Sequence, residues 1–241
     1  MFNKLAKLIV GCFVLSVFLF SCKPTTDETT VTKTYGKIQV FHAAIEAPAI
    51  NFLVDEVKIN TDSLSYSKGT PYYLAVLTAN KKNLFKVFIA KSGQMIVKDS
   101  LEMKTTDVGY SVFVYQDKDA SKTLRTIYTP DNLLAPAAGK AKVRFVHLLS
   151  DASINIDVEA VAPGGSATEA SQFTNLSFPK ISDYIEMAKG TYDLKIKISG
   201  QKNVILNVTG VTIEEGKIYS LVARGYSQLS NKAGVTLITN K

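Results

Sequence analysis

The chain has 241 residues, of which 46% are hydrophobic, and a formal net charge of +7. This length is typical of one or two globular domains. The positive charge does not predict nucleic-acid binding, because the lysines are scattered: Lys195 and Lys197, for example, alternate with apolar residues in the segment LKIKI. We therefore expect no nucleic-acid partner.

Residues 1–21 have the pattern of a bacterial export signal. Lys4 and Lys7 precede an apolar run from Leu8 to Phe20, which is shorter than the roughly 20 residues that a membrane-spanning helix needs. The run ends in the segment LFSC, which resembles a lipobox, the motif whose cysteine is lipidated and becomes the mature N-terminus. We expect a lipoprotein signal peptide over residues 1–21 and lipidation of Cys22. The alternative is an ordinary signal peptide that is cleaved nearby.

The second cysteine, Cys12, lies inside the apolar run and would be removed with it. The mature chain would then keep only Cys22, so we expect no disulfide and no thiol nucleophile. Residues 22–35 are polar and rich in threonine, which predicts a flexible tether. Residue 23 is lysine rather than aspartate, and by resemblance to lipoprotein sorting rules this favours the outer membrane. We expect a lipid-anchored protein there, facing the periplasm or the cell surface.

Short runs of β-branched and aromatic residues follow, separated by turn signals such as TANKKN and KSGQ. About seven such runs in about 100 residues, with no convincing long helix, predict a β-sandwich over residues 36–128. The predicted strands are Ile38–His42, Ile50–Val54, Tyr72–Leu77, Phe85–Ile89, Ile96–Ser100, Tyr110–Tyr115 and Thr123–Tyr128.

Residues 129–139 form the predicted linker, because Pro130, Pro136 and Gly139 interrupt regular structure there. Relative motion of the two domains is the usual consequence of such a linker. Alternatively, Leu133 and Leu134 pack between the domains and stiffen the pair.

The second predicted sandwich, residues 140–241, repeats the first. Its strands are Val143–His147, Ile154–Val158, Tyr184–Met187, Tyr192–Ile198, Val204–Val208, Ile218–Arg224 and Val235–Thr239. VFH at His42 corresponds to FVH at His147, LFKVFI to DLKIKI, and GYSVFV to IYSLVA, always in the same order, which indicates duplication. One insertion, residues 162–171 (APGGSATEAS), is interpreted as a tolerated surface loop or, alternatively, a binding loop.

The segment AKVRFVHLLSDASINIDV resembles the start of the DUF4397 family of exported bacterial and archaeal proteins, whose pattern is an apolar strand, His-Leu-Ser-Pro-Asp-Ala-Pro and a second strand. In the first copy, Glu46 stands in for the acidic residue, and the late segment GKIYSLVARG resembles the closing strand of the family. The residues that match are Arg144, Phe145, Val146, His147, Leu148, Asp151 and Ala152 in the second copy, and His42, Ala47, Pro48 and Ala49 in the first. Leu149-Ser150 and Ser153 depart from the pattern. The resemblance implies an all-β chain of two tandem immunoglobulin-like antiparallel β-sandwiches, and it implies no established activity.

His42 and His147 are the only imidazoles in the chain. A hydrolase needs a nucleophile, a base and an orienting group within reach of one another, and no Gly-x-Ser-x-Gly elbow is present. We therefore expect no enzymatic activity, with an envelope hydrolase as the less favoured alternative. A neutral imidazole offers one donor and one acceptor. We expect each histidine to tie the following loop, which carries Glu46 or Asp151, to the neighbouring strand as a structural motif.

Metal binding is not expected either, and neither is a cofactor. Each copy offers zinc one histidine and few nearby carboxylates, and the segment QDKDAS lacks the remaining ligands of a calcium loop. The carboxylates weighed for these sites are Glu46 and Asp55 in the first copy, Asp151 and Asp157 in the second, and Asp117 and Asp119 in QDKDAS.

Carbohydrate binding would use exposed aromatic side chains, for which Tyr66, Tyr72, Tyr115 and Tyr226 are candidates, although packing in the core is the favoured interpretation. We expect a non-enzymatic binding or adhesion module that contacts a protein or an envelope polysaccharide. The alternative is a structural subunit of a surface assembly, which an exposed apolar edge strand would favour. The sequence does not indicate an oligomeric state.

Overall fold

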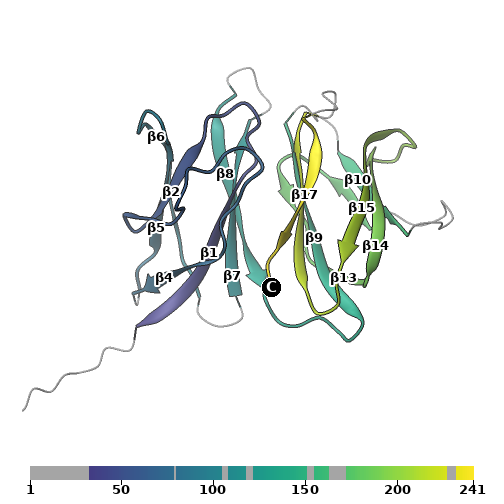
Figure 1. The fold of residues 1–241 in the computed structure, drawn as a ribbon, viewed down its shortest axis with the longest axis horizontal. Coiled ribbons are helices and arrows are strands. Elements are labelled where there is room, and N and C mark those ends of the chain that lie inside the picture. Colours follow the sequence, from purple (N-terminus) through teal and green to yellow (C-terminus); the bar gives the residue numbers. More distant parts are fainter. Residues whose placement is uncertain are drawn as a thin grey trace, which may run out of the picture. The chain divides into compact units, whose positions relative to one another are not determined.

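The structure, a computed structural model, describes residues 33–78, 80–104, 108–117, 122–150, 155–162, 172–226 and 232–241. These residues form strands and contain no helix, which confirms the all-β prediction (Figure 1). No helix in this part of the chain is therefore long and apolar enough to cross a membrane. The predicted signal peptide, Cys22, Asp119, Asp151 and residues 163–171 of the predicted loop lie outside the described residues.

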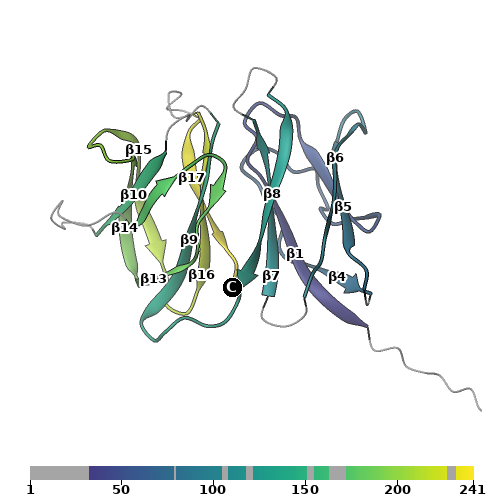
Figure 2. The same cartoon turned by 180° about the vertical axis from the view of Figure 1, so that it is seen from behind.

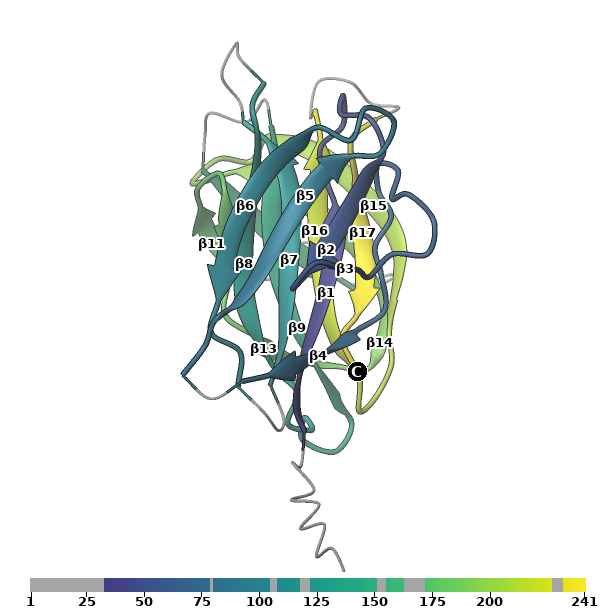
Figure 3. The same ribbon diagram turned by 90° about the vertical axis from the view of Figure 1, so that its left-hand side faces the viewer.

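The first half forms two sheets that pack as a sandwich. One sheet has the strand order β4-β1-β7-β8 and the other the order β3-β2-β5-β6, which Figure 3 shows with β6, β5 and β2 side by side. In β5, Phe85 and Val87 point into the core, where Phe85 stacks on Phe52 with ring centroids 5.5 Å apart. The strands are β1 (Thr34–His42), β2 (Ile50–Val54), β3 (Val57–Lys58), β4 (Tyr73–Leu77), β5 (Asn83–Ile89), β6 (Met95–Leu101), β7 (Val108–Gln116) and β8 (Leu124–Asn132).

The second half repeats this arrangement, except that two short strands, β12 and β13, take the place of β4. One sheet has the order β12-β9-β16-β17, with β13 also paired to β9, and the other has the order β11-β10-β14-β15 (Figure 2). Its strands are β9 (Lys140–Leu149), β10 (Ile156–Val161), β11 (Phe173–Leu176), β12 (Lys180–Ile181), β13 (Ile185–Ala188), β14 (Gly190–Ile198), β15 (Val204–Ile213), β16 (Ile218–Gly225) and β17 (Gly234–Thr239). The same order of pairing in both halves is what a duplicated module produces.

The sheets are antiparallel except for one pair in each half. Strands β1 and β7 run parallel, as do their counterparts β9 and β16. These pairs are not predictable from the sequence, because alternation along a strand shows which face is buried and not which neighbour supplies the hydrogen bonds.

Strand β8 continues beyond its predicted end and includes residues 129–132 of the predicted linker. It accommodates Pro130 because, among the described strands, β8 pairs only with β7 and therefore lies at a sheet edge. Leu133, which follows β8, is buried at 3% exposure, whereas Leu134 is 55% exposed.

A third buried cluster joins the two halves. Phe41, Ala43, Phe113 and Tyr115 of the first half pack with Val146, Leu148 and Val222 of the second. We call this contact between the sheets that contain β1 and β9 the interface. These sheets have their own sandwich core on one side and the interface on the other, so β7 and β16 are buried along almost their whole length.

Candidate functional site

A buried ion pair lies in the interface. The Arg144 side chain on β9 is 1% exposed and that of Asp131 on β8 is 0% exposed, with Arg144 Nη2 2.5 Å from Asp131 Oδ1. Arg144 Nε also donates to Ser220 Oγ at 2.8 Å, and its guanidinium lies 4.8 Å from the centre of the Tyr184 ring. A buried charge needs such partners, since an unpaired ion in the interior is strongly unfavourable.

Further hydrogen bonds extend this pair across the interface. Ser111 Oγ donates to Asp131 Oδ2 at 2.7 Å, and the Tyr72 hydroxyl donates to the same oxygen. Burial and the neighbouring Asp131 carboxylate both raise the pKa of Tyr72. Asn240 Nδ2 donates to Ser111 Oγ at 3.4 Å and Gln39 Nε2 donates to it at 2.8 Å. The network therefore joins β1, β7 and β8 of the first half to β9, β16 and the C-terminal segment of the second.

A second polar contact between the halves lies near Tyr66, in the segment between β3 and β4. The Tyr66 hydroxyl donates to Lys232 O at 2.9 Å and accepts from Arg224 Nη1 at 3.0 Å, while the Arg224 guanidinium lies 4.9 Å from the centre of its ring. Gly225 allows this approach, because a Cβ there would lie 2.3 Å from Lys232 O, and its φ of +90° also favours glycine. Glycine at this position is thus part of how the halves meet.

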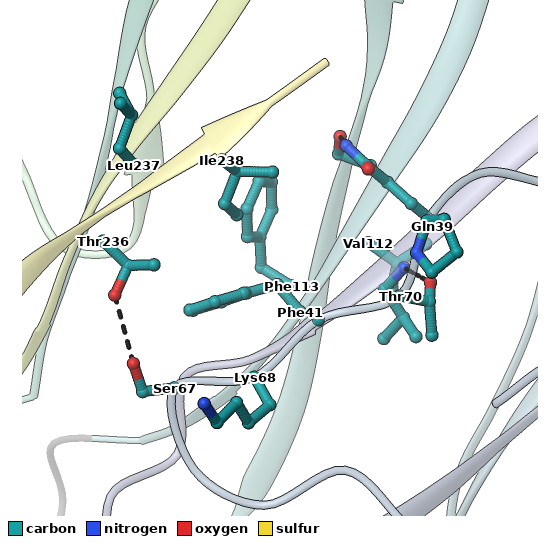
Figure 4. Close-up of a pocket in the computed structure, with 14 residues that line it drawn as sticks. Gln39, Phe41, Ser67, Lys68, Thr70, Val112, Phe113, Thr236, Leu237 and Ile238 are labelled. Atoms are coloured by element: carbon teal, nitrogen blue, oxygen red, sulfur yellow. Dashed lines mark hydrogen bonds between the residues drawn. The ribbon is translucent and has the colours of Figure 1, made fainter. Parts of the chain in front are cut away.

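Between these two polar regions the interface opens into a groove, which is a cavity of about 280 Å³ (Figure 4). Its apolar part includes Phe41 and Phe113, whose rings meet edge to face with centroids 6.4 Å apart, and Ile238 of β17. Segment 67–71, β1 and β7 form its first-half wall, and residues 236–238 of β17 form its second-half wall. Both copies of the module are therefore needed to build the groove.

Apart from Lys68, the polar side chains of the groove wall are already hydrogen bonded to one another or to the backbone. Ser67 Oγ and Thr236 Oγ1 share a hydrogen bond of 3.1 Å, drawn in Figure 4. Thr70 Oγ1 accepts from Val40 N–H at 3.1 Å, and Gln39 donates to Ser111 as described above. What these contacts leave available to a ligand is mainly the apolar surface of the groove.

His42 is the last residue of β1, whereas β9 continues for two residues beyond His147, and both side chains are completely buried. His42 Nδ1 accepts from Ala44 N–H at 3.2 Å and Nε2 lies 3.1 Å from Pro48 O, so its imidazole binds the backbone of the loop between β1 and β2. Burial lowers the pKa of His42. His147 Nδ1 accepts from Leu149 N–H at 3.4 Å, and its ring packs edge to face on Phe178.

The described carboxylates that were candidate metal ligands bind other groups of the protein. Glu46 is exposed and pairs with Lys122, whose hydrogen bond is the main reason that the pKa of Glu46 is lowered. Asp55 accepts from Leu84 N–H at 2.8 Å, and Asp157 accepts from Asn175 N–H at 2.8 Å. Among the described residues, no group of three or more His, Cys, Asp or Glu side chains could hold a metal ion.

The four candidate tyrosines divide into two pairs. Tyr72 and Tyr115 belong to the interface, where Tyr115 packs edge to face on Phe178 with centroids 5.6 Å apart. Tyr66 and Tyr226 are half-buried, and each ring lies beside a cation. The Arg224 guanidinium faces the Tyr66 ring, and Lys122 Nζ lies 5.9 Å from the centre of the Tyr226 ring. None of the four is a free, exposed aromatic platform.

The residues that build the interface are not among the predicted site residues. Asp131 lies in the predicted linker, and Arg144 stands out in the sequence only as a match to the family pattern. One signal could have found the interface: the segments YSVFVYQ and VRFVHLL are mainly apolar on both faces, unlike DLKIKI, in which Asp193, Lys195 and Lys197 share one face. Such runs indicate strands that are covered on both sides.

Comparison with known families gives two matches to one family, described as a domain of unknown function (DUF4397), over residues 36–159 and 152–241. The chain belongs to the DUF4397 family. The two matches overlap at residues 152–159, and the first extends beyond the first half, through β9 and into β10. No curated protein matches the sequence.

Among solved structures, the DUF4397 chain is similar to the Bacillus anthracis TIE protein, with 11% identity, a TM-score of 0.27 and coverage of 79% of this chain and 50% of that one. It is also similar to a family 26 carbohydrate-binding module of Eubacterium rectale Amy13K in complex with maltoheptaose, with 9% identity, a TM-score of 0.25 and coverage of 85% and 97%. The chain thus spans about half the length of the TIE protein. TM-scores this low support no inference about fold or function.

Proposed function

We propose that this chain is a non-enzymatic binding protein of the cell envelope, anchored by lipid at Cys22, whose two sandwiches together form one binding site. The observation that supports the site best is the groove, whose walls come from both halves and whose hydroxyl groups are already hydrogen bonded. Concave, largely apolar surfaces between domains are the places where proteins most often bind ligands. Both imidazoles hold local backbone in the interior, which fits a scaffold better than a reaction centre.

Photo-crosslinking in intact cells tests the binding site. A photoreactive residue replaces Lys68, which lines the groove, and in a matched control it replaces Lys98, which is exposed on β6. We expect an adduct of defined mass from position 68 and none from position 98. Equal labelling at both positions, or none at position 68, would contradict the proposed site.

The anchor is tested separately, by membrane fractionation of Cys22→Ser. We expect this variant to leave the membrane fraction, because a chain without its lipid has no other predicted means of attachment. Unchanged fractionation would refute lipidation at Cys22 and leave the groove proposal intact.

A second candidate function is a structural subunit of a surface assembly. It is favoured by an apolar strip on β1 and β4 formed by Tyr35, Leu74 and Val76, whose side chains are 44–53% exposed. Tyr35 and Val76 are cross-strand partners, and among the described strands β4 pairs only with β1, so the strip lies along a sheet edge. An exposed apolar edge strand of this kind can pair with a strand of another chain. If Val76→Lys abolishes self-association measured by light scattering, the assembly role is supported; a monomeric wild-type chain excludes it.

A further inference from the structure

The groove has an open strand edge along one wall. Strand β17 is the last strand of its sheet and, among the described strands, pairs only with β16. Asn240 N–H donates to Ile218 O at 2.7 Å, just beyond the ladder that pairs Ser220 with Ile238. Backbone groups alternate between the two sides of an antiparallel strand. The N–H and C=O groups of residues 235, 237 and 239 therefore point away from β16, toward the free edge.

The position and size of the groove suit a single large side chain. Residues 236–238 of this same strand line it, and Leu237 is 36% exposed. Its volume of about 280 Å³ lies just below the range of about 300–1,000 Å³ that is typical of sites for drug-sized ligands. Phe41 and Phe113 are buried beneath the groove, so the surface that would receive an aromatic or branched aliphatic group comes from Pro71, which is exposed, and Ile238, which is half-buried.

The groove also carries a positive charge. Lys68 lines the groove and is exposed, and within the described parts of the chain no carboxylate pairs with it. The nearby Arg224 is already occupied by Tyr66 and Thr236. An acidic group on a ligand would therefore find its complement in Lys68.

We propose that the groove binds an extended peptide segment of a partner protein. The segment pairs with the free edge of β17, inserts one bulky apolar side chain against Pro71 and Ile238, and places an acidic residue beside Lys68. This is strand addition, in which backbone hydrogen bonds provide affinity and a side-chain pocket provides specificity. The inference rests on the groove being the binding site, and it specifies the chemistry of the ligand.

A polysaccharide fits the groove less well. Sugars need free hydrogen-bond partners and exposed aromatic faces, but the hydroxyls of Ser67, Thr70 and Thr236 are already bonded. Phe41 and Phe113 are only 4% and 0% exposed, so their faces are not available for stacking. The unpaired N–H and C=O groups of a strand edge match the spacing of those of a peptide backbone and not the hydroxyl groups of a sugar.

The test begins with a random heptapeptide library displayed on phage, selected on the mature chain made soluble by Cys22→Ser. We expect enriched peptides that combine a bulky apolar residue with a neighbouring acidic residue. Bound peptide should slow hydrogen exchange at the amides of residues 235, 237 and 239. Enrichment of no peptide, or slowed exchange only at strands remote from β17, overturns the proposal.

Two pairs of variants separate the backbone contact from the charge. Leu237→Pro removes an outward N–H without disturbing the bonds to β16, whereas Leu237→Ala shortens the side chain and keeps the N–H. We expect Leu237→Pro to bind the selected peptide about tenfold more weakly than Leu237→Ala. Lys68→Glu should weaken binding, and Lys98→Glu, on remote β6, should not.

Peptides that carry N-methyl groups supply the same test without altering the protein. Methylation of the amides that face β17 should abolish binding, and methylation of the alternate amides should not. Equal effects of both methylation patterns would refute strand addition even if Leu237→Pro fails to fold.

The outcomes also distinguish this inference from the proposed function. If the residue at position 68 crosslinks a polysaccharide in cells and no peptide is selected, the groove binds a ligand but the peptide inference is wrong. A dimer in light scattering that Leu237→Pro disrupts would show that a second copy occupies the edge, which also overturns the proposal. If neither crosslinking nor selection finds a ligand, both proposals fail.

Discussion

Removal of the Asp131 carboxylate should destabilise the protein strongly. In Asp131→Asn the shape of the side chain is kept, but Arg144 loses the carboxylate oxygen that lies 2.5 Å from its Nη2. Both side chains are essentially inaccessible, at 0% and 1% exposure, so water cannot replace the lost charge. Breaking a buried ion pair by removal of one partner typically costs about 3–5 kcal/mol. We expect a loss of this size in the free energy of unfolding, measured by urea denaturation.

The chain offers a matched control in the pair formed by Asp117 and Arg125. The distance between Arg125 Nε and Asp117 Oδ2 is also 2.5 Å, but the side chains are 23% and 53% exposed. Exposed pairs contribute about 0–1 kcal/mol, so Asp117→Asn should cost far less than Asp131→Asn. In a double-mutant cycle, Asp131→Asn combined with Arg144→Met should cost less than the sum of the two single changes. Equal costs for Asp131→Asn and Asp117→Asn would refute the buried interface.

Three further predictions concern packing and titration. Gly109→Ala places a Cβ about 2.7 Å from the Tyr72 ring and should lower the free energy of unfolding by about 1–3 kcal/mol; a thermal midpoint equal to that of the wild type would contradict this. Gly225 has a φ of +90°, and a Cβ there would lie 2.3 Å from Lys232 O. Gly225→Ala should therefore lower the free energy of unfolding by at least about 1–3 kcal/mol, and a variant as stable as the wild type in denaturation would show that the loop contact does not form. Burial lowers the pKa of His42 below its ordinary value of 6.5, so the unfolded chain binds more protons and stability should fall as the pH drops below about 6.5. His42→Gln should lack this component of the pH dependence, and identical pH profiles would contradict the assignment.

The strands were predictable where one face alone is buried. Phe85 and Val87 of β5 point into the core as the alternation in LFKVFI indicates, and Leu194 and Ile196 of β14 repeat this in the second half. The repeat itself was also visible, since segments that match in sequence occupy the same places in the two sandwiches.

The interface was not predictable in the same way. A linker of prolines and alanines after residue 128 indicates freedom between domains, and only the folded chain shows that β8 continues to Asn132 and buries Asp131. Arg144 lies in the middle of an apolar strand, where sequence alone does not name its partner. The groove depends on that contact, because its two walls are far apart in the chain and meet only when the halves pack.

The contact of the two sandwiches across the groove is tested most directly by an engineered disulfide. Ser67 Oγ and Thr236 Oγ1 are 3.1 Å apart, and they belong to different halves. Sulfur atoms at these γ positions would need only a small side-chain movement to bond, and residues 23–241 contain no cysteine that would compete. We expect the double variant Ser67→Cys/Thr236→Cys to form this bond nearly completely on mild oxidation of the folded protein, detected by mass spectrometry of the digested chain. Free thiols at both positions after oxidation would contradict the interface and the groove that it forms.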